Sequence, residues 1–305
     1  MSERSERADG HCSAAPDPWA EWLLHRRDGD YPATREVTAR ALQRIRDKVL
    51  ADAALVPGDR VLDVGCGDGL VGLRAAELVG PDGHVTFTDF SALLLRHAAD
   101  AAALAGLDKR CSFVHSALPD LAELPDACFD VVTIRSVLIY VADKAGALAT
   151  VHRVLRPGGR LALFEPINSF GLPADPNRLW GFGVDGALDE AATVSRVAAA
   201  NAPEHATMLG FDERDLFALV QRAGLVDVRM DYHAEIAAGS PPAADVDSFL
   251  ATAANPLAPT YGELLARALT PDAAGRLRDR LARAFVERDF VRRVAVAHLA
   301  ARRPN

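Results

Sequence analysis

The segment VLDVGCGDG at positions 61–69 constrains the fold of this chain more than any other feature. An apolar run that is typical of a buried strand leads into Asp63, and glycines follow at positions 65, 67 and 69. Glycines permit a tight turn and let the backbone approach a ligand, because no Cβ stands in the way. The next residues have a helical pattern, so the positive end of a helix would face that ligand. The segment therefore predicts a strand, a ligand-binding loop and a helix.

The same alternation of strand and helix continues along the chain. Strands separated by helices of about 10–15 residues favour a parallel sheet with helices on both faces. The sequence predicts an α/β fold, a doubly wound, Rossmann-like, seven-stranded and mostly parallel sheet with helical cap insertions. The expected strands are 60–64, 84–89, 112–115, 129–134, 160–164, 226–233 and 292–300, and the expected helices are 19–27, 34–53, 70–79, 91–105, 143–155 and 213–223.

Two segments interrupt this pattern after position 166. Residues 168–210 are rich in Gly, Pro and Asn and then become Ala-rich and helical, while residues 242–286 are mostly helical. A structureless loop of either length is unusual inside a compact domain, so both are interpreted as insertions that build a cap.

The glycine loop does not match the dinucleotide-binding pattern G-x-G-x-x-G, because that pattern needs a glycine at position 70, where Leu70 stands. The pattern is instead an acid followed by three alternating glycines. It resembles the first motif of class I S-adenosylmethionine-dependent methyltransferases. The residues Asp89 and RVLRPGGRLAL at 153–163 lie where that family has its second acidic residue and its helix–turn–strand signature.

The resemblance implies S-adenosylmethionine as the cofactor. Asp89 would accept hydrogen bonds from the ribose hydroxyls, and Asp63 would organise the loop near the ammonium group; as alternatives, Asp89 would cap the next helix and Asp63 would only cap backbone amides. The family often has an acid where Ser116 stands, so this departure speaks against a side-chain bond to the adenine amino group and leaves a backbone contact open. The implied cofactor-binding residues are Asp63, Gly65, Cys66, Gly67, Gly69, Asp89, Phe90, Ser116, Ala117 and Arg135.

Three residues are candidates for catalysis. Tyr140 follows the fourth expected strand and Glu165 ends the fifth, at the sheet edge where open α/β folds bind ligands. His25 lies in an N-terminal helix that often folds over the cofactor in this family. The alternatives are that Tyr140 packs in the core, that Glu165 pairs with an arginine of the cap, and that His25 is a surface residue.

These expectations divide the chain into segments. The division is an N-terminus without order at 1–16, a helical lid at 17–55, a cofactor-binding core at 56–166, a cap insertion at 167–210, a return to the core at 211–234, a second insertion at 235–288, and a final strand with the C-terminus at 289–305.

Composition and charge limit the partners. The net charge is −8 and no basic run occurs, which disfavours nucleic acid. No apolar run approaches the roughly 20 residues of a membrane span, and the N-terminus lacks the apolar core of a signal peptide. The cysteines at 12, 66, 111 and 128 form no CxxC pair, so we expect no metal site and a cytoplasmic location. A homodimer stays open.

The expected function is methyl transfer from S-adenosylmethionine to a small molecule by in-line displacement. Two other functions stay open. The chain would be a sensor or partner subunit that binds the cofactor without methylating anything, or, as a weaker alternative, a nicotinamide-dependent oxidoreductase.

Overall fold

The main sheet has seven strands, six of which run in the same direction. The computed structural model describes residues 17–172, 174–200 and 205–305. Strand order is β3-β2-β1-β4-β5-β9-β8, with β9 antiparallel to both of its neighbours. This confirms the predicted doubly wound α/β fold. The strands are β1 (Arg60–Val64), β2 (His84–Asp89), β3 (Cys111–His115), β4 (Phe129–Arg135), β5 (Leu155–Pro166), β8 (Val226–Ala238) and β9 (Val291–Arg302).

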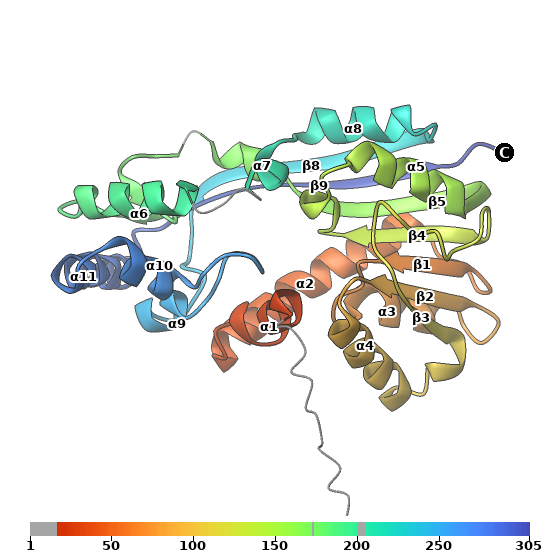
Figure 1. Cartoon of the computed structure of the whole chain (residues 1–305), viewed down its shortest axis with the longest axis horizontal. Coiled ribbons are helices and arrows are strands. Elements are labelled where there is room, and N and C mark those ends of the chain that lie inside the picture. The colour runs from red at the N-terminus through yellow and green to blue at the C-terminus, as the bar shows by residue number, and fades with distance from the viewer. Residues whose placement is uncertain (1–16, 173, 201–204) are drawn as a thin grey trace, which may run out of the picture.

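Helices cover the sheet on both faces (Figure 1). Successive side chains of a strand point to opposite faces, so Val61 packs in the core beneath α2, α3 and α4, and Leu62 packs in the core beneath α5 and α8. These two apolar layers hold the central strands in place. The helices are α2 (Pro32–Ala53), α3 (Leu70–Leu78), α4 (Ala92–Leu104), α5 (Lys144–Val154) and α8 (Glu213–Arg222), with a short 3-10 turn η2 (Asp108–Arg110) before β3.

The strand order reverses between β1 and β4. From β1 the chain adds β2 and β3 on one side, and it then returns to add β4 and β5 on the other. The loops that leave the carboxyl ends of β1 and β4 therefore diverge and open a crevice, which is where open α/β sheets bind their ligands.

A short helical segment precedes α2. Asp17 caps helix α1 (Pro18–Glu21), since its side chain accepts hydrogen bonds from the backbone N–H groups of Trp19 and Ala20, and a π-helical turn η1 (Trp22–Arg26) follows. The predicted helices at 19–27 and 34–53 are confirmed. The expectation for residues 1–16 lies outside the described residues.

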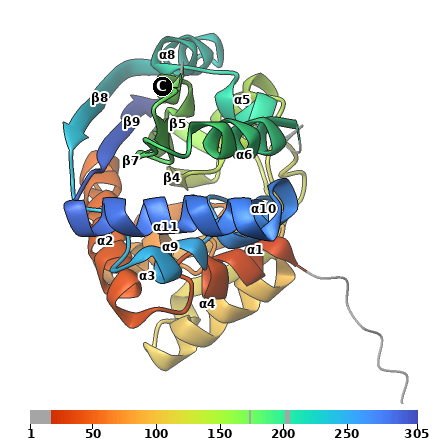
Figure 2. The same ribbon diagram turned by 90° about the vertical axis from the view of Figure 1, so that its left-hand side faces the viewer.

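The cap elements from the two insertions share one apolar core. Phe182 is fully buried, and its ring centroid lies 5.1 Å from that of Phe249 and 4.6 Å from that of Phe285. The first insertion therefore packs directly against the second, and Figure 2 shows α11 crossing in front of the rest of the cap. The elements are η4 (Asn168–Gly171), β6 (Arg178–Leu179), β7 (Phe182–Gly183), α6 (Leu188–Ala200), α7 (His205–Leu209), α9 (Val246–Leu250), α10 (Tyr261–Ala268) and α11 (Pro271–Glu287).

Two strands are longer than their sequence pattern predicts. Strand β8 continues through the alanines at 237 and 238, because β9 pairs with it as far as Ala238 opposite Val291. The expected boundary at 234 thus falls inside β8. Strand β5 begins at Leu155, which pairs with Phe129 before a bulge at the glycine turn. None of the described helices combines the length and apolarity that a bilayer span requires.

Candidate cofactor and acceptor site

A cavity of about 760 Å³ opens at the carboxyl ends of the parallel strands. Its walls come from the loops that follow β1, β2, β3 and β4, from α2, and from the N-terminal helices. The cavity brings together many of the predicted site residues, which are Gly65, Gly67, Asp89, Phe90, Ser116, Ala117, Arg135 and Tyr140.

The glycine loop has a backbone that only glycine adopts easily. Gly65, Gly67 and Gly69 have φ values of 63°, 55° and 84°. Gly65 also lacks room for a side chain, because an added Cβ would lie 2.4 Å from Cγ2 of Val137. Cys66 between them is buried, and burial raises the pKa of its thiol. The backbone conformation of the glycines therefore determines the shape of the loop. The Cys66 thiol is buried and protonated, so it is not positioned to react.

Asp89 ties the loop after β1 to the start of α4. Its Oδ2 accepts a hydrogen bond from the N–H of Gly67 and its Oδ1 accepts one from the N–H of Ser91, both at 2.9 Å. Burial raises the pKa of the Asp89 carboxyl. The N-cap of α4 is Ser91 and not Asp89, since Ser91 Oγ accepts from Leu94 N at 3.0 Å. Each carboxylate oxygen has a second lone pair, so Asp89 can also accept from hydroxyls in the cavity.

The third loop contributes its backbone more than its side chain. Ser116 and Ala117 line the cavity, but Ser116 Oγ donates a hydrogen bond of 2.9 Å to the carbonyl oxygen of Asp120 within the same loop. The Ser116 hydroxyl is therefore engaged within its own loop.

Asp63 lies beneath the loop and does not line the cavity. Its Oδ2 accepts from the N–H of Gly72 at 2.9 Å and its Oδ1 accepts from the hydroxyl of Thr133 at 2.7 Å. Burial raises the pKa of the Asp63 carboxyl to about 6. Asp63 therefore caps a backbone amide, as the alternative interpretation held. It does not reach the cavity, where an ammonium group of the cofactor would bind.

Glu165 is likewise hidden from the cavity, which corrects the expectation of a group that meets the substrate. Its side chain is fully buried, and it makes no ion pair with an arginine among the cap residues that the structure describes. Instead Oε1 accepts from the N–H groups of Val137 and Leu138, and Oε2 accepts from that of Ile139. These three bonds hold the 3-10 turn η3 (Leu138–Tyr140) against the end of β5.

Tyr140 and Arg135 do face the cavity. Burial, together with the nearby Glu165 carboxylate, raises the pKa of Tyr140 to about 12, so this residue is a neutral hydrogen-bond donor at neutral pH. Its ring centroid lies 6.1 Å from that of Trp19. Arg135 makes no ion pair with any of the described residues. Its charge acts to lower the pKa of the nearby Asp63 carboxyl, and a guanidinium that lines a mostly apolar cavity is suited to an anionic ligand group.

His25 lies outside the cavity. Its side chain is 55% exposed, and Nδ1 lies 3.9 Å from Oδ1 of Asp30. Because η1 turns His25 toward solvent, the structure does not bring it to Tyr140, and the expected catalytic role is corrected to a surface position.

The N-terminal helices line one side of the cavity, and residues 17–27 are called the lid below. Trp19, Trp22, Leu23 and Arg27 line it, and the ring of Trp19 stands edge-on to Phe90 with centroids 4.7 Å apart. Ser91 Oγ donates a hydrogen bond to Asp17, which anchors the start of the lid beside Asp89. The tryptophans are therefore placed between the cofactor loops and the cap.

The rest of the cavity lining is mainly apolar. Sequence reasoning missed Leu42 and Ile45 of α2, whose apolar stripe predicts core packing rather than a pocket wall. Phe164, Pro166, Asn168, Met208, Ala254 and Pro256 also line the cavity.

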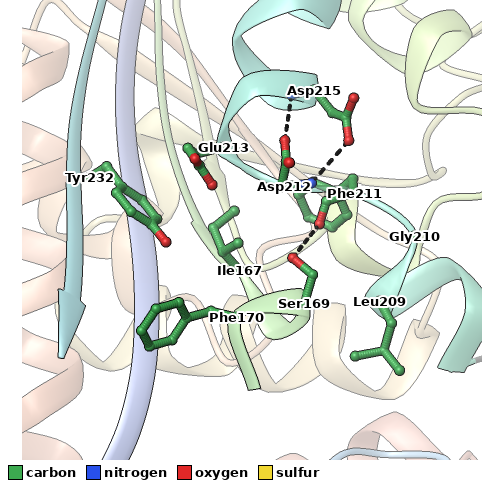
Figure 3. Close-up of a pocket in the computed structure, with 10 residues that line it drawn as sticks. All are labelled: Ile167, Ser169, Phe170, Leu209, Gly210, Phe211, Asp212, Glu213, Asp215 and Tyr232. Atoms are coloured by element: carbon green, nitrogen blue, oxygen red, sulfur yellow. Dashed lines mark hydrogen bonds between the residues drawn. The ribbon is translucent and has the colours of Figure 1, made fainter. Parts of the chain in front are cut away.

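A second hollow of about 440 Å³ lies between η4 and the start of α8 (Figure 3). Phe170 and Tyr232 border it on one side. On the other side Asp212 and Asp215 form the capping box of α8, and Ser169 Oγ donates to the carbonyl oxygen of Phe211. Its aspartates thus serve the helix end, and it holds none of the predicted site residues.

Comparison with known proteins shows which family this chain belongs to. Residues 55–218 match a family model described as a methyltransferase domain. A 27-O-demethylrifamycin SV methyltransferase of Amycolatopsis mediterranei is 37% identical over 166 residues, which are 53% of this chain and 58% of that protein. The ubiquinone/menaquinone biosynthesis C-methyltransferase UbiE of Ectopseudomonas mendocina is 34% identical over 155 residues, 50% of this chain and 59% of its own length. The chain thus spans less than two thirds of these relatives.

Solved structures share the fold. A geranyl diphosphate methyltransferase in complex with SAM superposes with a TM-score of 0.52 at 17% identity, and the match covers 90% of this chain and 94% of that one. The YcgJ protein of Bacillus subtilis superposes with a TM-score of 0.51 at 17% identity and covers 88% of this chain and 99% of its own.

Proposed function

Because this chain belongs to the class I S-adenosylmethionine-dependent methyltransferases, we propose that it transfers a methyl group to a small molecule by in-line displacement. One observation carries the proposal. The glycine loop, Asp89 and Arg135 meet in a single cavity that the lid and the cap also border.

The lining residues fit the chemistry of S-adenosylmethionine. We assign the ribose hydroxyls to Asp89, the adenine to the backbone at Ser116 and Ala117, and the cofactor carboxylate to Arg135. The glycines at 65 and 67 would let the backbone approach the methionine part. Phe90 would pack beside the adenosine, under the edge of Trp19.

The acceptor would occupy the apolar part of the cavity. Leu42, Ile45, Phe164 and Met208 line it, and an acceptor with a large apolar surface gains free energy by leaving water there. Asn168 supplies an amide that orients one polar group of such a molecule.

The protein would act mainly by alignment. When bound, S-adenosylmethionine supplies a methyl group that moves to an acceptor lone pair while the electrons of the broken C–S bond stay on sulfur. Holding two reactants in line contributes up to roughly 7–11 kcal/mol in well-oriented systems. The lid and the cap would enclose the pair and exclude water, and Tyr140 would donate a hydrogen bond from the cavity wall.

Calorimetric binding of S-adenosylhomocysteine tests the cofactor site. We expect the wild type to bind and Asp89→Ala to bind about tenfold or more weakly, since a hydrogen bond to a charged group contributes roughly 1.5–3 kcal/mol. Asp59→Ala is the matched control, because Asp59 is also a buried carboxylate but lies before β1, at the other end of the strands. A wild type without measurable binding contradicts the proposal.

Turnover separates an enzyme from a sensor. With S-adenosylmethionine and a panel of apolar phenols, amines and carbon acids, an enzyme releases S-adenosylhomocysteine in an acceptor-dependent way. Binding of the cofactor without release for any acceptor of the panel favours the sensor.

We also propose that the protein acts in the cytoplasm and forms a homodimer. Cys66, Cys111 and Cys128 are free thiols, as in a reducing compartment. Strand β8 lies at the edge of the main sheet, where a second copy could pair. Cell fractionation and sedimentation equilibrium test the two proposals separately.

A further inference from the structure

We infer that Glu165 is a positioning residue, which holds the turn after β4 in the conformation that closes Val137 against the cofactor loop. The inference rests on the proposed function only where it uses cofactor affinity as a readout. Glu165 itself does not line the cavity, so its effect must pass through the turn.

The geometry around Glu165 is that of an anion held by backbone amides. Its side chain is 0% exposed at the end of β5. Oε1 accepts from Val137 N and Leu138 N, each at 2.9 Å, and Oε2 accepts from Ile139 N at 3.1 Å. Three consecutive N–H groups converge on one carboxylate, an arrangement that needs both oxygens to be acceptors.

The turn needs such a support because its first residue is strained. Ser136 has a φ of 55°, in the left-handed region that side-chain-bearing residues rarely adopt. The N–H of Ser136 donates to the carbonyl oxygen of Phe164 at 2.8 Å, so the strained residue is fastened to β5 next to Glu165. Strand β5 thus fixes the turn at four successive amides.

The fixed turn shapes two walls of the cavity. Val137 packs so closely on Gly65 that no Cβ fits between them. At the end of the same turn, Tyr140 lies beside Trp19 of the lid. A relaxed turn would therefore loosen the cofactor loop from one side and the lid contact from the other.

The charge of the Glu165 carboxylate governs how well it accepts the three hydrogen bonds from the backbone N–H groups. Burial raises the pKa of its carboxyl to about 7, while the three amides and Lys144 of α5 act in the opposite direction. The Lys144 ammonium donates to the carbonyl oxygens of Val141 and Thr207. Tyr140 also lies close enough to Glu165 for the two groups to interact electrostatically. Protonation places an O–H donor among three N–H donors, so the turn is held less well as the pH falls below about 7.

Glu165→Gln tests the inference with S-adenosylhomocysteine as the probe. Glutamine keeps the shape but replaces one accepting oxygen by an NH2 donor. By calorimetry between pH 6 and pH 8.5, we expect wild-type affinity to fall about fivefold or more toward pH 6. The variant should bind weakly at pH 8 and show little change with pH. Amide hydrogen exchange at positions 137–139 should be faster in the variant without any ligand.

Asp130→Asn is the matched control. Asp130 is a buried carboxylate that accepts from Arg60 N at 2.7 Å near the start of β4, away from the cavity. It should leave the affinity and its pH profile unchanged. Equal losses in both variants, or a Glu165→Gln variant that behaves as the wild type, overturn the inference.

If Glu165→Gln does not fold, the Val137→Ala variant tests the inference instead. This variant keeps Glu165 and its bonds but removes the contact with Gly65, so it should weaken binding and retain the pH dependence. Unchanged affinity overturns the inference. A wild type without binding contradicts the proposed function instead, and hydrogen exchange at 137–139 then still tests whether Glu165 holds the turn.

Discussion

The indole nitrogen of Trp22 donates a hydrogen bond of 2.8 Å to the carbonyl oxygen of Ala253, and this bond joins the lid to the cap. The N–H of Ala253 returns a bond of 3.1 Å to the carbonyl oxygen of Arg26, whose side chain pairs with Glu263 at 2.7 Å. The neighbouring Ala254 lines the cavity. The lid thus closes on the cap, which also borders the expected acceptor space.

Trp22→Phe should speed the release of S-adenosylhomocysteine. Phenylalanine keeps an aromatic ring but removes the donor, which leaves the carbonyl oxygen of Ala253 without its partner. The loss of a neutral hydrogen bond predicts a dissociation rate about two- to tenfold higher in stopped-flow experiments. Trp180→Phe is the control, because Trp180 packs on Tyr261 within the cap and does not line the cavity. Equal rates in the wild type and Trp22→Phe would show that the hydrogen bond from Trp22 to Ala253 does not slow release.

Gly65→Ala should abolish measurable binding of S-adenosylhomocysteine. The new Cβ would meet Val137 at 2.4 Å in a backbone with a φ of 63°. Gly106→Ala isolates the effect of the backbone strain from that of the steric contact, because Gly106 has a φ of 69° but open space around it. The control should lose about 1–2 kcal/mol of stability and keep its affinity. Thermal unfolding and calorimetry on both variants check this, and binding by Gly65→Ala would show that Val137 can move aside.

Asp63 should make stability depend on pH below neutrality. The pKa of its carboxyl is about 6 in the folded protein against an ordinary value of 3.8. Between these values the folded state keeps a proton that the unfolded state has released, so the free energy of unfolding falls as pH rises from about 4 to 6. The shift corresponds to roughly 3 kcal/mol at most.

Asp63→Asn isolates this contribution. Its amide can accept from Gly72 N and donate to Thr133, so the variant should fold. Urea unfolding from pH 4 to pH 7 should show the wild type losing stability relative to the variant over that range. The titration of Glu165 is common to both proteins and cancels in the difference. Parallel stability curves would contradict the raised pKa.

Phe182→Ala should destabilise the cap. Its ring packs on those of Phe249, Phe285 and Phe290 with no solvent exposure, and such a deletion costs about 3–5 kcal/mol. Val286→Ala on α11 is the control, because that side chain is 86% exposed and should change stability by less than about 0.5 kcal/mol. Urea unfolding measures both, and a small change for Phe182→Ala would mean that the cap does not share the cooperative unfolding of the core.

The sheet could be predicted because local patterns determine its strands. β1 and β2 begin and end where their apolar runs do, and the spacing of the three glycines identifies the glycine loop in the sequence. The shared core of the cap could not be predicted, since Phe182 and Phe285 meet across a hundred residues of sequence. The start of β8 was predicted correctly, but its last residues were not, because β9 supplies the pairing that its alanines do not suggest.

The parts of the candidate site that are formed by loop backbone were predicted well. The parts that depend on the direction of a side chain were predicted poorly. A carboxylate at a strand end is visible in the sequence, but its direction is not. Asp89 turns into the cavity, whereas Asp63 and Glu165 turn under the backbone and accept from amides. Leu42 and Ile45 show the converse, since an apolar helical stripe looks the same whether it faces a core or a pocket.

The second insertion leaves and re-enters the sheet at one place. Ala238 at the end of β8 pairs with Val291 at the start of β9, and Gly239 N donates to the carbonyl oxygen of Phe290. A segment whose two ends are neighbours can be lengthened, shortened or exchanged without moving the strands that carry it. Evolution can therefore rebuild the part of the cavity wall that Ala254 and Pro256 of this insertion supply, while the loops that follow the parallel strands stay as they are.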